Sequence, residues 1–183
     1  MNKKYDVVII GAGAAGMMSA IEAGKRGRRT LLIDHSKKIG EKIRISGGGR
    51  CNFTNINANS SKYISSNPSF IISALNQYNP ESFINLVKKY KIKYHEKKLG
   101  QLFCDNSAQQ IIDMLLKECE LANVTLKIET KVVKLNYKEK IFIIRDNVET
   151  YLSSSLIIAT GGLSVPKIGA SKFGYDVAKQ FNL

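Results

Sequence analysis

Cysteine and histidine are scarce in this sequence of 183 residues. The three cysteines, Cys51, Cys104 and Cys119, are odd in number and include no CxxC pair, so we expect neither a disulfide framework nor a zinc site. The two histidines, His35 and His95, have no partner at metal-ligand spacing, and we assign both to the surface. These absences exclude a disulfide-stabilised secreted domain and favour a reducing, cytoplasmic location without a bound metal.

Long hydrophobic runs are also missing. The most apolar stretch follows Lys3 and Lys4 and extends to Ile21, which resembles a signal peptide in outline. Asp6 interrupts it, and the run is shorter than the roughly 20 apolar residues that span a bilayer. We therefore expect no leader and no membrane segment.

Acidic residues are few, with 15 Asp and Glu against 28 Lys and Arg, a formal net charge of +13. Such an excess suggests a nucleic-acid partner. Most lysines are scattered, however, and the one crowded stretch, Lys88–Lys98, has no aromatic RNA-binding motif beside it. We therefore favour a solvated basic face and keep RNA binding as the alternative. The length and the 44% hydrophobic content indicate one globular domain.

The clearest motif lies near the amino terminus. Val7–Ile10 is an apolar, mostly β-branched run that predicts a buried strand, and a GAGAAG turn and an Ala- and Met-rich helix follow. In such a motif the first glycine permits the tight turn, the second lets the backbone approach a pyrophosphate, and the third lets the helix lie close to the strand. The helix start then faces the phosphates. The residues expected there are Gly11, Gly13, Ala14, Ala15 and Gly16.

An acidic residue completes this motif. Thr30–Ile33 predicts a second buried strand that ends at Asp34, 18 residues after Gly16. A dinucleotide-binding fold places a carboxylate about 20 residues after its last glycine, where it accepts hydrogen bonds from ribose hydroxyls. A structural glycine turn in some other α/β protein would leave this acid unexplained. The order of strand, turn, helix, strand and acid therefore predicts a dinucleotide site.

A second glycine turn lies in a long excursion, residues 35–68, that lacks regular periodicity. Three glycines, residues 47–49, stand between Ser46 and Arg50, and Cys51 and Asn52 follow. Such a turn exposes several backbone N–H groups, and the arginine adds a fixed cation, so an anion or an electron-rich ring is expected there. A flexible linker is the alternative, but linkers do not normally place Arg-Cys-Asn directly behind glycines.

The remaining elements complete an α/β fold. Asn67-Pro68, Asn79-Pro80 and Ser107–Gln110 each predict a helix start, and Cys119 lies on the apolar stripe of the third helix. The expected later strands are a third parallel strand at 124–129, an antiparallel meander at 131–137, 140–145 and 149–152, and a buried strand at 156–159 that ends at Thr160-Gly161-Gly162. A meander where NAD domains usually carry a crossover helix marks the FAD-binding variant of this fold.

Three motifs make the chain resemble the amino-terminal half of the YhiN/BaiN family of flavoproteins, also described as aminoacetone-oxidase-family FAD-binding enzymes. The first is Gly11–Gly16 with Asp34, and the second, the most specific, is Ser46–Asn52 with Thr54 and Asn55. The third is Ala159–Gly162 with Ser164, Pro166, Gly169, Gly174 and Tyr175. The matches span the whole chain.

The resemblance implies a Rossmann-like FAD/NAD(P)-binding fold of the glutathione-reductase type, with a parallel sheet, a meander and a helical excursion. It also implies non-covalent FAD, with NAD(P)H as candidate electron donor. Asp34 would bind the adenosine ribose, Lys42–Asn52 would run along the flavin, and Val133 would offer backbone atoms to the adenine. The implied cofactor residues are Gly11, Gly13, Ala14, Ala15, Gly16, Asp34, Lys42, Ser46, Gly47, Gly48, Gly49, Arg50, Cys51, Asn52, Val133, Thr160 and Gly161.

The chain departs from the family in three places and in length. The family usually has Glu at Asp34, Arg and Pro near Gln101 and Cys104, and Gly-Asp at Lys172-Phe173. Family members are also much longer. We therefore expect residues 1–183 to be one truncated FAD-binding domain, without the carboxy-terminal substrate domain and the final FAD-contacting segment, which a separate gene could encode.

On the main interpretation the chain is the FAD-binding part of an oxidoreductase that transfers a hydride to or from a small organic substrate, such as an enone-type C=C bond. No catalytic acid or base can be assigned, and we expect Cys51 to pack beside the flavin rather than act as a nucleophile. The expected partners are a small substrate and a separate carboxy-terminal half, and neither a nucleic acid nor a membrane. The alternatives are a flavin module that acts on RNA, and a non-catalytic remnant of a split gene.

Overall fold

The computed structural model describes residues 2–164 and 171–183, and the chain divides into two compact units. The first unit combines the two ends of the chain, residues 1–42 and 115–183, and the second comprises residues 43–114. The second unit therefore holds most of the excursion expected from the sequence. Pro166 and Gly169 of the third motif lie outside the described residues. No helix in the described ranges is long and apolar enough to cross a membrane.

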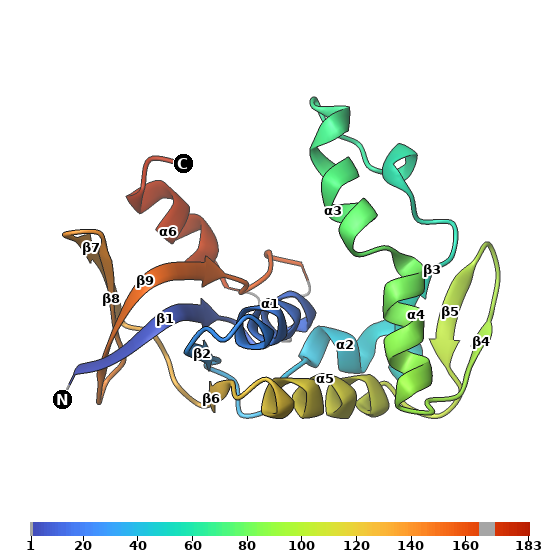
Figure 1. Cartoon of the computed structure of the whole chain (residues 1–183), viewed down its shortest axis with the longest axis horizontal. Coiled ribbons are helices and arrows are strands. Elements are labelled where there is room, and N and C mark those ends of the chain that lie inside the picture. Colours follow the sequence, from blue (N-terminus) through green and yellow to red (C-terminus); the bar gives the residue numbers. More distant parts are fainter. Residues whose placement is uncertain (1, 165–170) are drawn as a thin grey trace. The chain divides into compact units, whose positions relative to one another are not determined.

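The first unit contains a six-stranded sheet in the order β6-β2-β1-β9-β8-β7 (Figure 1). Strands β6, β2, β1 and β9 pair in parallel, and β9, β8 and β7 pair antiparallel. The predicted fold class, a parallel sheet extended by a meander, is confirmed. The elements are β1 (Asn2–Ile10), α1 (Ala14–Lys25), β2 (Thr30–Ile33), β6 (Thr125–Lys127), β7 (Lys134–Lys138), β8 (Ile141–Arg145), β9 (Thr150–Ile158) and α6 (Phe173–Gln180). Helix α5 (Gln109–Leu121) begins in the second unit and ends in the first.

The boundary between the meander and the last parallel strand differs from the prediction. Instead of two strands at 149–152 and 156–159, β9 is one strand that pairs with β8 near its start and with β1 along its whole length. Three serines, residues 153–155, interrupt the apolar pattern and suggested a break. The hydroxyls of Ser153 and Ser154 donate to the carbonyl of Asp6 at 3.3 and 2.8 Å, so the strand accommodates them without a turn.

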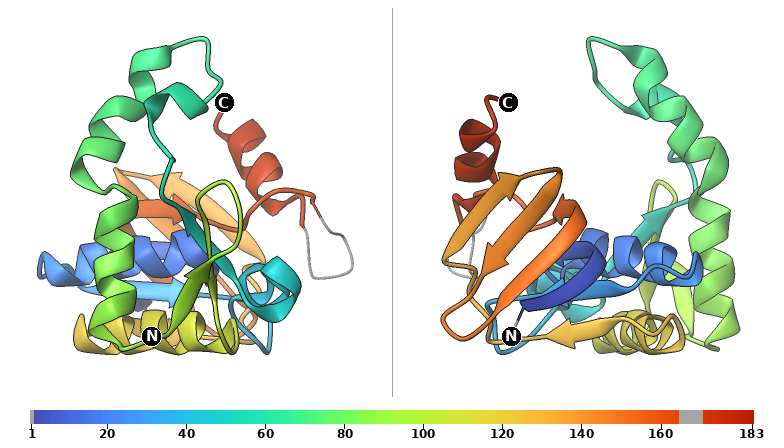
Figure 2. Two further views of the ribbon diagram at one scale, coloured as in Figure 1. Left: turned by 90° about the vertical axis from the view of Figure 1, so that its right-hand side faces the viewer. Right: turned by 60° about the vertical axis from the view of Figure 1, so that its left-hand side comes forward.

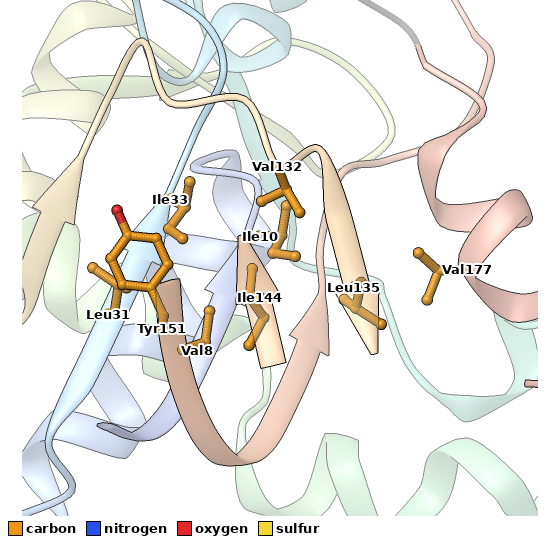
Figure 3. Packing of buried hydrophobic residues seen from close by; sticks show 9 residues of the cluster. All are labelled: Val8, Ile10, Leu31, Ile33, Val132, Leu135, Ile144, Tyr151 and Val177. Atoms are coloured by element: carbon orange, nitrogen blue, oxygen red, sulfur yellow. The ribbon is translucent and has the colours of Figure 1, made fainter. Parts of the chain in front are cut away.

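A hydrophobic cluster joins the parallel strands to the meander and to α6 (Figure 3). Its buried members are Val8, Ile10, Leu31, Ile33, Val132, Leu135, Ile144, Tyr151 and Val177. Because successive side chains of a strand point to opposite faces, Ile9 and Leu32 point away from this cluster. Both are also fully buried, so the central strands are covered on both faces.

Two helices of the first unit pack closely. A Cβ atom at Gly24 of α1 would lie 2.3 Å from the carbonyl oxygen of Ala122, just after α5. Cys119 of α5 is 3% exposed, and its thiol lies 3.7 Å from the carbonyl oxygen of Met17. Burial raises the pKa of the Cys119 thiol to about 11. The assignment of this cysteine to the core is therefore confirmed.

The second unit is built on a three-stranded antiparallel sheet in the order β3-β5-β4, seen in further views in Figure 2. Its elements are the end of α2 (Glu41–Ile45), η1 (Ser46–Gly49), β3 (Asn52–Asn55), η2 (Ser60–Lys62), η3 (Pro68–Ile71), α3 (Ile72–Gln77), α4 (Pro80–Lys89), β4 (Tyr94–Glu96), β5 (Gln101–Cys104) and the start of α5. The predicted helix starts are confirmed, because Asn67 and Asn79 accept hydrogen bonds from the N–H groups of Ser69 and Ser82. Phe70, in η3, is 77% exposed.

Candidate functional site

The turn between β1 and α1 can be made only with glycine at two positions. Gly11 has φ +109°, and a Cβ atom there would lie 2.5 Å from the carbonyl oxygen of Ala159 at the end of β9. A Cβ atom at Gly16 would lie 1.8 Å from the carbonyl oxygen of Gly11. Both contacts are far closer than real Cβ atoms allow, so these glycines hold the strand ends and the helix together. The structural roles predicted for them agree with this geometry.

Gly13 stands in open space instead. It is the N-cap of α1 with extended backbone angles, and a Cβ atom there would meet nothing within 4 Å. No side chain caps the helix, and Ala14 and Ala15 are exposed. The first N–H groups of a twelve-residue helix therefore face outward without a side-chain partner, which is the geometry that binds phosphate groups.

Asp34 supports this turn from the end of β2. Its carboxylate accepts hydrogen bonds from the N–H of Ala12 at 2.6 Å and from the N–H of Ser36 at 2.7 Å. The residue is 12% exposed, and His35 lies on its surface side, 3.6 Å away. Since a carboxylate has about four acceptor positions, Asp34 can fix the glycine turn and still accept from ribose hydroxyls.

Two predicted residues meet beyond β9. The ammonium group of Lys42 donates to the carbonyl of Gly162 at 3.2 Å and to the hydroxyl of Ser164 at 2.9 Å. Gly161 has φ +72°, and a Cβ atom added to it would lie 3.4 Å from the same ammonium group. Lys42 therefore holds the loop that follows the last parallel strand.

Thr160 carries a buried hydroxyl that has no hydrogen-bond partner in the described chain. A Cβ atom added to Gly11 would lie 2.9 Å from the Cα of Thr160, so Thr160 lies beside the glycine turn at the ends of the parallel strands. Unpaired buried polar atoms are rare in proteins, and a bound polar ligand is one way to pair them. Thr160 and the uncapped start of α1 therefore fit a dinucleotide.

Val133 has fewer backbone groups free to bind adenine than the sequence suggested. It is 54% exposed, but its N–H donates to the carbonyl of Arg145 at 2.8 Å within the meander. Only the carbonyl of Val133 is therefore left for an adenine amino group.

The second glycine turn, in the second unit, has three successive residues with left-handed backbone. Gly47, Gly48 and Gly49 have φ values of +59°, +66° and +86°, which other residues rarely adopt. A Cβ atom at Gly47 would also lie 2.6 Å from the ring of Phe103 on β5. The carbonyl of Gly49 accepts from the N–H of Ala108 at 2.7 Å. The turn is thus a fixed structure packed on the sheet and not a flexible linker.

The residues after this turn are an exposed cation, a buried thiol and an exposed amide. Arg50 is exposed, and no described residue forms an ion pair or side-chain hydrogen bond with it. Cys51 is 5% exposed, and burial raises the pKa of its thiol, opposed by a hydrogen bond with Ser46. A protonated, buried thiol is a poor nucleophile, as expected for this cysteine. The amide nitrogen of Asn52, in its favourable orientation, donates to the carbonyl of Leu102 at 3.2 Å.

The structure also pairs residues that the sequence analysis treated as isolated. Nδ1 of His95 on β4 lies 2.7 Å from the carboxylate of Asp105, and its ring stacks on Phe103. The two polar residues stand ten positions apart on neighbouring strand ends, so only knowledge of the hairpin could have revealed the pair. Within the described ranges, no group of three or more His, Cys, Asp or Glu side chains could hold a metal ion.

The predicted site residues therefore form two sets. The strand ends of the first unit bring together Gly11–Gly16, Asp34, Lys42, Thr160 and Gly161, with Val133 in the meander. The second unit holds Ser46–Asn52 as one turn.

Several curated proteins are similar to the chain. It is 53% identical to "Ribosomal RNA dihydrouridine synthase" of Escherichia coli over 99% of the chain and 45% of that protein. It is 46% identical to the protein of the same name from Haemophilus influenzae over 100% of the chain and 47% of that protein. It is 29% identical to "3-dehydro-bile acid delta(4,6)-reductase" of Clostridium scindens over 93% of the chain and 42% of that protein. The chain thus spans about half the length of the curated relatives it matches.

A solved structure with the same fold is the open conformation of a flavocytochrome c3 fumarate reductase. The TM-score is 0.63 at 19% identity, over 97% of this chain and 40% of that one. Residues 5–183 match the family described as "HI0933-like protein Rossmann domain". This match confirms the resemblance found in the three sequence motifs. The chain belongs to the HI0933-like family and carries its Rossmann domain.

Proposed function

We propose that the chain is the FAD-binding amino-terminal part of a flavin-dependent enzyme that reduces uridine to dihydrouridine in ribosomal RNA. The observation that carries the FAD site is the turn before α1, where two glycines are sterically required and Gly13 alone is open. The names of the two relatives at 53% and 46% identity support the substrate. Residues 1–183 act as one FAD-binding domain in this proposal.

The proposed substrate revises the main interpretation of the sequence. We expected a small organic substrate and no nucleic-acid partner, and the names of these two relatives conflict with that expectation. They favour the alternative, a flavin module that acts on RNA. The net charge of +13, which we first assigned to a solvated face, agrees with a polyanionic substrate. A cytoplasmic location accompanies a ribosomal RNA substrate.

In this proposal the chain's own residues bind and orient the cofactor. The N–H groups of Ala14, Ala15 and Gly16 bind the pyrophosphate, and Asp34 accepts from the adenosine ribose while it holds Ala12. Lys42 holds the loop that carries Gly161, and Thr160 donates its unpaired hydroxyl to the dinucleotide. These residues would hold FAD, which in its reduced form would supply a hydride for the reduction of the C5=C6 bond of uracil, together with a proton.

Two further parts of the proposal come from the resemblance. The resemblance places the Ser46–Asn52 turn along the flavin, and the exposed Arg50 guanidinium of that turn would be available for an anionic group. NAD(P)H would serve as the reductant, and a carboxy-terminal half would complete the substrate site, either on the same polypeptide or as a separate one.

The experiment uses the chain together with the carboxy-terminal half of the protein, encoded by the same gene or by a neighbouring gene. We expect a yellow protein that, with NAD(P)H and protein-free ribosomal RNA, produces dihydrouridine detectable by mass spectrometry of the nucleosides. A protein that binds no added FAD would contradict the cofactor assignment. A protein that binds FAD but leaves every uridine intact would contradict the substrate assignment.

A second candidate function is reduction of a small enone, supported by the similarity to the bile acid reductase of Clostridium scindens at 29% identity. The same holoenzyme separates the two functions. Oxidation of NAD(P)H on addition of a 3-keto-4-ene steroid, without dihydrouridine formation from RNA, would favour the enone reductase.

A further inference from the structure

We propose that a lysine arm on the second unit binds the phosphates of the RNA substrate; this proposal rests on the function proposed above. The lysine arm consists of Lys88, Lys89, Lys91, Lys93, Lys97 and Lys98, at the end of α4 and on both sides of β4. All six side chains are exposed. Figure 1 shows α4, β4 and β5 in succession along the chain.

The arm carries little neutralising charge. Lys88 lies 3.5 Å from the carboxylate of Glu81, whereas no described carboxylate pairs with Lys91, Lys93, Lys97 or Lys98. Glu96 is the sole acid between positions 88 and 98, and its carboxylate accepts from the N–H of Gly100 at 3.1 Å. Its carboxylate closes the β4–β5 hairpin, and six lysines against this one acid leave residues 88–98 with a formal charge of +5.

The charge asymmetry continues in the part of the second unit that precedes Glu81. No Asp or Glu occurs between residue 43 and Glu81, a stretch that contains Arg44, Arg50 and Lys62. A surface kept free of acids over such a length attracts polyanions at long range and does not repel them on contact.

Local structural roles explain only part of the arm. Lys88 and Lys89 stand in the last turn of α4, where positive charge is favourable to the helix dipole. Lys93 leads into β4, an edge strand, and lysines on edge strands oppose aggregation. Neither role accounts for Lys91, Lys97 and Lys98, so three exposed cations are left for a ligand.

Contacts within the second unit connect the arm to the second glycine turn. The ammonium group of Lys97 lies 5.3 Å from the ring centroid of Phe103, and His95 stacks on the same ring at 6.3 Å. Phe103 in turn packs against Gly47. The arm and the Ser46–Asn52 turn therefore belong to one packed part of the second unit.

The test compares two triple variants of the chain, each assembled with the carboxy-terminal half as in the experiment above. Lys93→Gln, Lys97→Gln and Lys98→Gln remove three charges from the arm and retain side-chain length. The control, called the hairpin variant, is Lys131→Gln, Lys134→Gln and Lys138→Gln, which removes three exposed charges from β7 and the residues just before it in the first unit. Lys91 is left in place because its φ of +55° makes substitutions there hard to interpret.

The probe is protein-free ribosomal RNA carrying a fluorescent label, and binding is measured by anisotropy at several salt concentrations. We expect the arm variant to bind on the order of tenfold more weakly, with a salt dependence shallower by about 2 to 3 in the log–log slope. The hairpin variant should bind nearly as the unaltered chain does. Replacing the same arm residues with Arg should retain binding.

The outcomes separate this proposal from the proposed function. Equal losses in the two variants would contradict the arm and leave RNA as the substrate. Absence of RNA binding by the unaltered chain assembled with its carboxy-terminal half, in a protein that takes up FAD normally, would contradict both. Circular dichroism melting curves and FAD uptake of all variants check the fold, and neither should change.

Discussion

Two glycines of the first turn provide a matched pair of substitutions. A methyl group on Gly16 would collide with the carbonyl oxygen of Gly11 at 1.8 Å, whereas one on Gly13 would meet nothing within 4 Å. Gly16→Ala should therefore lower the free energy of unfolding by about 3 kcal/mol or more, because the helix must move off the strand. Gly13→Ala should leave it nearly unchanged and weaken FAD binding. Thermal melts and FAD titrations check both, and equal losses of stability would contradict the roles assigned here.

Glu149 gives a pH-dependent prediction at the same scale. Its carboxylate accepts hydrogen bonds from Lys127, Lys3 and the hydroxyl of Tyr151, and these lower its pKa from 4.5 to about 2. A carboxylate with a lowered folded-state pKa stabilises the protein above its unfolded pKa, and that contribution is lost as pH falls from about 4.5 to about 2.

Glu149→Gln should consequently lower the melting temperature near neutral pH and have a smaller effect at about pH 3. The control is Glu139→Gln, on the exposed β7–β8 turn, which should have little effect at either pH. A difference between the unaltered protein and Glu149→Gln that grows on acidification would refute the assignment.

At the scale of elements, the triple-glycine turn can be divided by position. Gly47 and Gly48 have similar φ values, +59° and +66°, but only Gly47 contacts the ring of Phe103. Gly48→Ala should thus lose about 1 kcal/mol of stability from the left-handed backbone alone. Gly47→Ala should lose clearly more, since the clash adds to the same strain. Urea denaturation measures both, and a larger loss for Gly48→Ala would show that the turn packs differently.

The sequence identified elements best where a residue type has one structural purpose. The strand, turn, helix, strand and acid from Val7 to Asp34 were predicted closely. Gly11, at φ +109°, and Gly16, packed against a carbonyl oxygen, occupy positions that no other residue type can fill. The serines of β9 were misleading. A run of serines resembles a loop, and the sequence does not show that two of their hydroxyls donate to the carbonyl of Asp6. The pairing of β3, β5 and β4 into one sheet was missed for a different reason: these strands have three or four residues each, too few for a periodicity.

For the molecule as a whole, bulk charge was the least decisive signal. A formal charge of +13 is compatible with a solvated surface or with a polyanionic partner, and composition alone does not separate them. The placement of the charge is more informative, because the lysine arm is exposed and nearly without acids, while Lys127 and Lys3 pair with Glu149. The geometry at Gly13 and Thr160 supports the predicted cofactor residues in the same way, because one is open to a ligand and the other has a buried hydroxyl without a partner among the described residues.

Binding of FAD should stabilise the whole first unit, because the proposed ligand bridges the ends of β1, β2 and β9. A ligand that binds only the folded state at a hundredfold excess over its Kd contributes about 2.7 kcal/mol. For a domain of this size we expect the melting temperature to rise by roughly 5–10 °C. Gly13→Ala should retain the melting temperature of the unaltered chain without FAD and show a much smaller rise with it. Since this variant keeps the fold, an equal rise in both proteins would mean that FAD binds somewhere other than the start of α1.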